Sequence, residues 1–231
     1  MIKYLEWDSH FFKKKIGSCK VSILTEATLI DLFHEKTNKN YDLIYLFTQE
    51  TDKKAKKTLE ERYIKIIDKK VTYITHHIST SNQPTDFIIH YNGIISEELL
   101  QLTYLSGHES RFKKDPILNE KFEALYQQWI EKSLRGQMAD SVFVASIDNH
   151  IRGFVTVKKN SNMGQIGLIA VDPSYHGQGI GGALIKAAHK WYAKNGITQA
   201  SVVTQLDNTG ACKLYTKSGY NVAHTQLIYH I

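Results

Sequence analysis

Apolar side chains recur at two spacings along this chain, and the second half shows them most clearly. Residues 119–134 and the stretch after residue 180 place them on one helical face, which predicts two amphipathic helices. Runs rich in β-branched and aromatic residues predict strands at 142–147, 151–157, 163–171, 200–205 and 221–231. A further helix is predicted at 208–218, before the last strand. From residue 106 the order helix, helix, three strands, helix, strand, helix, strand predicts an α+β domain, an α/β layered sheet flanked by helices.

The first hundred residues mix strand-like runs with polar helices. Residues 16–24 and 41–48 predict strands, and the charged segment 51–62, which lacks glycine and proline, predicts an exposed helix. Residues 63–67 and 71–78 predict a pair of strands joined as a hairpin.

One polar segment, residues 79–86 with Pro84 inside it, is the most linker-like part of the chain. We therefore expect an N-terminal α/β lobe, residues 1–105, followed by a second domain, residues 106–231. No run approaches the ~20 apolar residues of a membrane span, and the first residues lack the apolar core of an export signal. Cys19 and Cys212 are too few and too far apart for a disulfide framework, which predicts a reducing, cytoplasmic location.

The net charge of +6 limits the classes of partner. The lysines form short, separate clusters without interleaved arginines or stacking aromatics, which argues against nucleic acid and leaves the steering of an anionic substrate as an alternative to a solvated surface. His76, His77 and His90 lack partners at ligand spacing, so we expect no metal.

Residues 171–185 say most about function. They comprise the end of an apolar strand, a turn at Pro173, four glycines and a helix. Glycines let the backbone turn sharply and approach a ligand, and the helix directs free amide N–H groups and the positive end of its dipole at the loop. This construction is typical of a phosphate site.

The same loop formally matches G-x-G-x-x-G at Gly177, Gly179 and Gly182, with Asp207 near the place of a ribose-binding acid. Against a dinucleotide fold, the motif follows an antiparallel meander, and too few residues follow Asp207 to complete the sheet. No Gly-Lys-Ser/Thr is present for a kinase-type P-loop. A turn without a ligand remains an alternative, although the glycines cost chain entropy that a plain turn does not require.

This stretch resembles the acyl-CoA pyrophosphate loop of the GNAT N-acyltransferases. It runs from a strand through Val-Asp-Pro-x-Tyr and x-Gly-Gln-Gly-Ile-Gly into a helix. The resemblance implies a GNAT fold, with a central mixed, mostly antiparallel sheet, and acyl-CoA as co-substrate. Its strand end would splay and pair with the pantetheine arm, chiefly through Ile169 and Val171, and the loop amides would hold the diphosphate. The implied contact residues are Leu168, Ile169, Ala170, Val171, His176, Gly177, Gln178, Gly179, Ile180, Gly181 and Gly182. The family prefers Arg or Gln in place of His176, which implies weaker charge assistance.

A second segment, residues 208–220, is similar to the family's N-x-x-A-x-x-L-Y-x-x-x-G-F pattern. The resemblance implies that Asn208, Ala211 and Leu214 also contact CoA, with Asn208 capping its helix. Tyr215 would point at the CoA sulfur and protonate the departing thiolate, because a phenol is neutral at pH 7. Packing of Tyr215 is the alternative, and Cys212 is interpreted as a small packed residue.

Within the family, the chain resembles the TDP-fucosamine acetyltransferases and related dTDP-amino-sugar N-acyltransferases. The matching pieces are residues 5–12, 110–112, 129–130 with 135–136, 151–155, 166–170, and 204–205 with 208–209. This implies a homodimer that transfers an acetyl or short hydroxyacyl group directly to the amine of a dTDP-linked 3- or 4-amino-dideoxyhexose, for a surface polysaccharide. A protein or polyamine acetyltransferase, or a silent CoA-binding module, is the alternative.

Candidate acceptor residues cluster at residues 108–112. A sugar amine is partly protonated near neutral pH, so a base or a water relay should remove a proton, and Glu109 and His108 are the candidates. Arg111 is the candidate for acceptor contact, because a planar guanidinium suits a diphosphate or carboxylate, with Ser110 and Phe112 beside it. A solvated loop, and an intrahelical ion pair for Arg111, are the alternatives.

Overall fold

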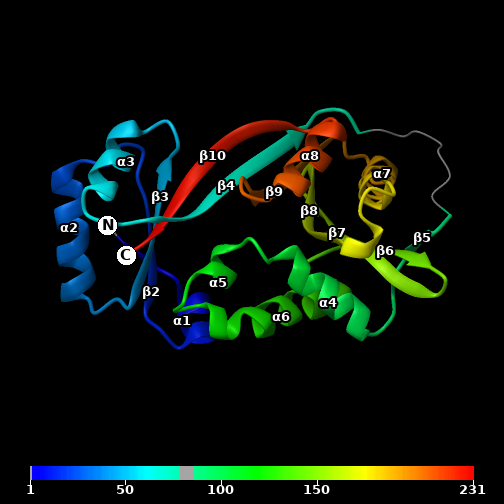
Figure 1. Ribbon diagram of the computed structural model, residues 1–231, viewed down its shortest axis with the longest axis horizontal. Coiled ribbons are helices and arrows are strands. Elements are labelled where there is room, and N and C mark those ends of the chain that lie inside the picture. Colours follow the sequence, from blue (N-terminus) through cyan, green and yellow to red (C-terminus); the bar gives the residue numbers. More distant parts are fainter. Residues whose placement is uncertain (1, 79–85) are drawn as a thin grey trace.

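A single ten-stranded sheet organises residues 2–78 and 86–231, which the computed structural model describes. The strand order is β1-β2-β3-β10-β4-β9-β8-β7-β6-β5 (Figure 1). The strands are β1 (Lys3–Tyr4), β2 (Ile16–Lys20), β3 (Leu43–Gln49), β4 (Ile66–Thr75), β5 (Ile88–His90), β6 (Ser141–Ile147), β7 (His150–Asn160), β8 (Met163–Val171), β9 (Gln199–Gln205) and β10 (Asn221–His230). Neighbouring strands are antiparallel except for the β2–β3 and β8–β9 pairs, so the predicted mixed, mostly antiparallel sheet is confirmed.

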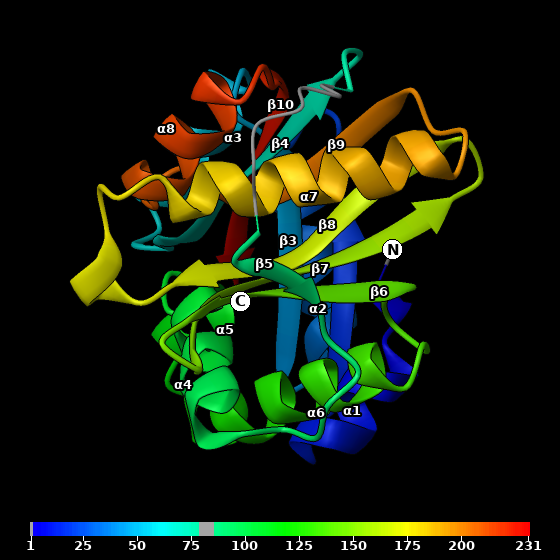
Figure 2. The same ribbon diagram turned by 90° about the vertical axis from the view of Figure 1, so that its right-hand side faces the viewer.

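Helices cover both faces of the sheet. In Figure 2, α7 and α8 lie on one face, and α1, α4, α5 and α6 lie on the other. The helices are α1 (Glu6–Phe12), α2 (Glu26–Asn38), α3 (Lys53–Glu60), α4 (Glu97–Ser106), α5 (Arg111–Lys114), α6 (Phe122–Leu134), α7 (Ile180–Lys194) and α8 (Thr209–Lys217), with short 3-10 turns η1 (Asn119–Lys121) and η2 (Pro173–Tyr175). None of the described helices is long and apolar enough to cross a membrane.

Three apolar clusters hold these layers together. One lies between α4, α6 and the strands β6 to β8, and a second lies under α7. The third joins α2 and α3 to β3 and β10. In each cluster, alternate residues of a strand face opposite layers. Leu43 and Tyr45 of β3 belong to the first cluster, whereas Ile44 and Leu46 belong to the third.

Strand β4 corrects the predicted hairpin at residues 63–78. Asp68, Lys69 and Lys70 continue one strand, and they pair with Ile228, Leu227 and Gln226 of β10. On its other side β4 pairs with β9. The polar residues at its centre therefore lie within a continuous strand, not in a turn.

The sheet runs through both predicted parts of the chain, because β4 lies between β9 and β10. The division into residues 1–105 and 106–231 stays a prediction about folding units. The linker-like segment 79–86 lies, apart from Asp86, outside the described residues.

Candidate active site

Strands β8 and β9 separate at the centre of the sheet. They pair only from Met163 with Gln199 to Ile166 with Val202, whereas β8 stays paired with β7 as far as Val171. The N–H group of Asp172 bonds back to the carbonyl of Arg152 on β7 (2.9 Å). By alternation, the backbone groups of Ile169 and Val171 point away from β7, toward the gap left by β9. The end of β8 therefore offers an unpaired edge.

A β-bulge in β8 begins this separation. Between Val155 and Val157, β7 faces one extra residue of β8. The hydroxyl oxygen of buried Thr156 accepts a hydrogen bond from the Leu168 N–H group (2.8 Å). A Cβ at Gly167 would lie 2.8 Å from that oxygen, so the bulge requires glycine there.

The turn after β8 is fixed by its own side chains. Asp172 accepts a hydrogen bond from the Ser174 N–H group (2.9 Å) and pairs with Arg152 (3.1 Å). The Ser174 hydrogen bond and the Arg152 charge hold the pKa of Asp172 below its usual range. The His176 ring, through Nε2–H, donates to the Val171 carbonyl (3.0 Å). His176 thus ties the glycine loop to the end of the strand.

The glycines shape the loop that begins α7. Gly177 and Gly179 have φ values of 78° and 84°, a left-handed conformation that glycine adopts without strain. The first-turn amides of Ile180, Gly181 and Gly182 have no intrahelical acceptor, because they begin the helix. No side chain of the described residues caps α7 at Gly179 either. A Cβ at Gly177, Gly179 or Gly182 would meet nothing within 4 Å among the described atoms. Backbone amides are presented to open space, as an anion site requires.

A cavity of about 1010 Å³ lies between this loop, the β8 edge, α7 and α8. Thirteen of the residues that sequence resemblance assigns to CoA line it: Ile169, Ala170, Val171, His176, Gly177, Gly179, Ile180, Gly181, Gly182, Asn208, Ala211, Leu214 and Tyr215. Leu168 instead packs into the core between the sheet and α6. Gln178 directs its amide at the Ser174 carbonyl (3.5 Å).

Tyr215 reaches the cavity from α8. Asn208 caps this helix by accepting the Ala211 N–H group (3.1 Å). The Tyr215 ring is almost completely buried, against Tyr73 (5.6 Å between centroids) and Tyr220 (6.0 Å). Burial, reinforced by the neighbouring Tyr220, Cys212 and Tyr73, raises the pKa of Tyr215 well above its usual range. The phenol is therefore protonated at neutral pH.

A glycine-rich loop at a helix N-terminus, a separated strand edge and a buried tyrosine line one cavity, and the chain matches a known family. The family model described as acetyltransferase (GNAT) family matches residues 103–220, which is half of the chain. This chain belongs to the GNAT family. A crystal structure of a GCN5-related N-acetyltransferase from Sphaerobacter thermophilus has the same fold, with a TM-score of 0.53 and 18% identity over 89% of this chain and 64% of that chain.

Two sequence relatives of this GNAT protein are connected with sugars by name. A dTDP-fucosamine acetyltransferase from Escherichia coli O6:H1 is 30% identical over 149 residues, 62% of this chain and 64% of that protein. The spore coat polysaccharide biosynthesis protein SpsD from Bacillus subtilis is 25% identical over 59% of this chain and 47% of that protein. The chain thus spans less than two thirds of the length of each.

Several cavity residues of this GNAT protein were missed from the sequence. Leu105 and Ser106 reach the cavity from the end of α4, and His77 follows β4. Lys186 and His189 line it from α7. Lys186 and His189 follow Gly182 by four and seven residues, which places them on the same helical face. This spacing is the sequence signal that could have identified them. The His189 ring bonds Tyr220 Oη (2.9 Å), and burial lowers its pKa to about 4, so it is neutral at pH 7.

The candidate acceptor residues 108–112 follow Ser106 but do not line this cavity in the described part of the chain. His108 is exposed, and Glu109 pairs with Lys114 (2.9 Å), which also pairs with Asp207 (3.4 Å). Ser110 and Phe112 are buried, and Phe112 packs between the rings of Phe12 and Trp129.

Arg111 is held in a different way. Its guanidinium lies over the rings of Tyr45 (4.8 Å) and Phe112 (4.3 Å). Its Nε atom is buried without a hydrogen-bond partner, and its side chain makes no ion pair with any residue that the structure describes. The intrahelical ion pair is therefore absent among the described residues, and the guanidinium stacks on two rings, with the charges of Asp8 and Asp68 also acting on it.

Proposed function

We propose that this protein transfers an acyl group, acetyl or short hydroxyacyl, from acyl-CoA to the amine of a dTDP-linked 3- or 4-amino-dideoxyhexose, for a surface polysaccharide. The observation that carries the proposal is the single cavity that combines the glycine loop, the free β8 edge and Tyr215. The names of the Escherichia coli and Bacillus subtilis relatives support a sugar acceptor.

Donor binding follows from the backbone groups in the cavity. We assign the diphosphate of CoA to the amides of Ile180, Gly181 and Gly182, with Lys186 on the same face of α7 adding positive charge. The amides of the pantetheine arm would pair with the free backbone groups of Ile169 and Val171. His176 already uses the Val171 carbonyl, but a carbonyl oxygen has two lone pairs and can accept a second hydrogen bond.

Transfer requires a neutral amine and stabilisation of the departing thiolate. The amine nitrogen attacks the thioester carbonyl carbon, the C–S bond breaks, and the nitrogen loses one proton. A thiol has a pKa of about 8.5 in peptides, well below that of the buried Tyr215 phenol, so complete proton transfer from Tyr215 is uphill. We therefore assign to Tyr215 a hydrogen bond to the thiolate. For the amine proton, we propose His108 or Glu109 acting through water, since neither lines the cavity.

An acceptor screen tests this proposal. The full chain is incubated with acetyl-CoA and, in turn, a dTDP-4-amino-4,6-dideoxyhexose, the corresponding 3-amino sugar, spermidine and a lysine peptide. We expect thiol release above background with the nucleotide sugars alone. A higher kcat/KM for spermidine or the peptide would overturn the sugar assignment, and CoA binding without transfer to any amine would favour a silent CoA-binding module. The homodimer and the cytoplasmic location stay predictions.

A further inference from the structure

A second cation lies close to Arg111, on the neighbouring strand β4. Lys70 is opposite Gln205 of β9 and Gln226 of β10. Asp68, two residues earlier, lies near Arg111 and Gln205, which both lower its pKa against the larger effect of burial. Residues two apart on a strand share a face, so Lys70 also points to the side of the sheet that α5 covers. Lys70 and Arg111 thus approach each other from two elements.

The charges of Asp8 and Asp68 act on Arg111, and the charge of Asp68 also acts on Lys70, but from beyond ion-pair distance. Neither side chain forms an ion pair within the described parts of the chain. Lys70 is half-buried, and its burial, followed by the charges of Arg111 and Lys20, lowers its pKa. Asp68 offsets part of this repulsion, but it is only 2% exposed, and burial raises its own pKa to about 6. Partly desolvated like charges are unfavourable, and a bound anion would relieve that repulsion.

An ion pair connects α5 to the rim of the cavity: Lys114 of α5 pairs with Asp207 (3.4 Å), which directly precedes Asn208, a residue that lines the cavity. Ser106 lines the cavity at the end of α4, and Arg111 begins α5 five residues later. Gln205, the β9 neighbour of Lys70, lies three residues before Asn208, which also lines the cavity. An acceptor whose amine enters the cavity can therefore extend its anionic part toward Lys70 and Arg111.

We propose that Lys70 and Arg111 form the subsite for the diphosphate of the nucleotide-sugar acceptor. This deepens the proposed function and rests on it. A guanidinium fixed by two rings offers its donors in a planar fork, and lysine adds a point charge, a combination suited to a diphosphate. The glycine loop on the other face of the sheet is left for the diphosphate of CoA.

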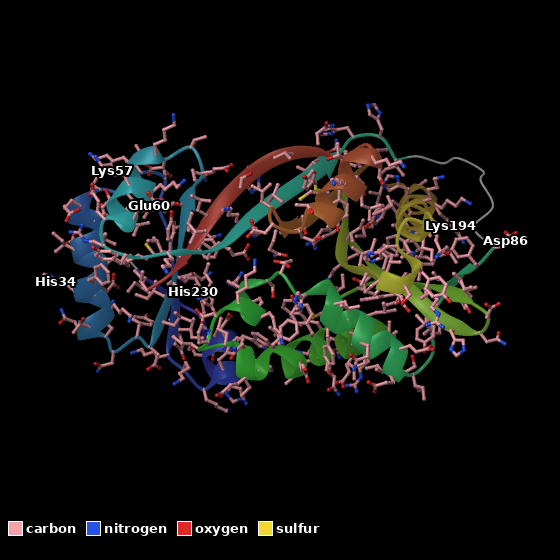
Figure 3. The ribbon with its side chains drawn as sticks, viewed as in Figure 1. His34, Lys57, Glu60, Asp86, Lys194 and His230 are labelled. Atoms are coloured by element: carbon pink, nitrogen blue, oxygen red, sulfur yellow. The ribbon has the colours of Figure 1, made fainter. Side chains whose placement is uncertain are left out.

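Steady-state kinetics of Lys70→Met and Arg111→Lys test this subsite. Arg111→Lys keeps the charge and most of the packing volume, so it guards against misfolding. We expect KM for the dTDP-amino sugar to rise about 10- to 100-fold, the loss expected for a hydrogen bond to a charged group, with kcat and the KM for acetyl-CoA unchanged. Lys57→Met, at an exposed position of α3, is the matched control, because Figure 3 places Lys57 at the opposite end of the molecule from Lys194 of α7.

Two further measurements separate the subsite from the proposed function. The methyl glycoside of the same amino sugar lacks the diphosphate, so its kcat/KM should be equal in wild type and variants. Calorimetric binding of dTDP alone should weaken in both variants, even if no sugar is acylated. The subsite is overturned if dTDP binds all three proteins equally or not at all, or if the acetyl-CoA KM rises in parallel. If dTDP binding depends on Lys70 but no amino sugar is acylated, the proposed function is wrong and the subsite stands.

Discussion

Tyr215 shows how burial decides the chemistry of a single residue. Its phenol is enclosed by other rings, and its raised pKa keeps it protonated at neutral pH. A protonated phenol can donate a hydrogen bond, so in the proposed mechanism we assign Tyr215 as a preorganised donor and not as a phenolate. The residue type was predictable from the sequence, but this distinction depended on the surrounding aromatic rings.

Replacing Tyr215 by Phe should lower kcat about 100-fold, the usual cost of one preorganised donor, and leave the KM for acetyl-CoA nearly unchanged. Because the pKa of Tyr215 is raised above its ordinary value near 10, the wild-type rate should show no loss from its ionisation up to pH 10. Tyr63→Phe, at a 91% exposed position, is the control. Unchanged turnover in Tyr215→Phe would remove the phenol from the mechanism.

His189 makes stability depend on pH. Its folded pKa of about 4 lies below the unfolded value near 6.5, so the unfolded chain binds more protons between these values. The stability from the neutral ring is complete above pH 6.5 and is lost as the pH falls toward 4, by up to about 1.4 kcal/mol per pH unit. In His189→Gln, which does not titrate, urea unfolding at pH 7 and pH 5 should differ less than in wild type. An equal difference in both proteins would contradict this assignment.

At the scale of elements, the bulge between β7 and β8 precedes the free edge of β8, to which we propose that the donor binds. Thr156 satisfies the Leu168 N–H group at this bulge, and β8 pairs with β9 only as far as Ile166. Thr156 lies on β7, the strand before β8 in the meander. We therefore expect β7 to hold the free edge of β8 in place.

Thr156→Val is nearly isosteric but leaves that buried N–H group without an acceptor. The free energy of unfolding should fall by about 1–3 kcal/mol, and the KM for acetyl-CoA should rise because the β8 edge is no longer held in place. Thr156→Ser retains the hydroxyl oxygen and should restore the KM. If both variants show the wild-type KM for acetyl-CoA, the hydroxyl stabilises the fold without positioning the donor.

The sequence was informative where the chemistry is local. The glycine loop and the 208–220 helix each lie within one short stretch, and the cap of Asn208 on Ala211 follows from neighbouring residues. The single strand β4 was missed because Asp68 and Lys70 face α5, an environment that only the assembled sheet creates. The stacking of Arg111 on Tyr45 could not be predicted from the sequence either, because Tyr45 belongs to the distant strand β3.

At the scale of the whole molecule, β4 makes the two predicted parts interdependent. It supplies the pairing partner of both β9 and β10, so residues 106–231 alone would leave two facing edges unsatisfied. We expect that fragment to lack a cooperative thermal transition by circular dichroism. Addition of residues 1–105 as a separate chain should restore it. A cooperative transition in residues 106–231 alone would establish an independent domain.

The position of β4 also determines when the protein can fold during synthesis. Its partners on β9 and β10 lie far after β4 in the sequence and are therefore translated much later. Contacts so distant in sequence form slowly, because loop closure must precede them. The nascent chain therefore carries β4 without these two partners until β9 and β10 have been translated.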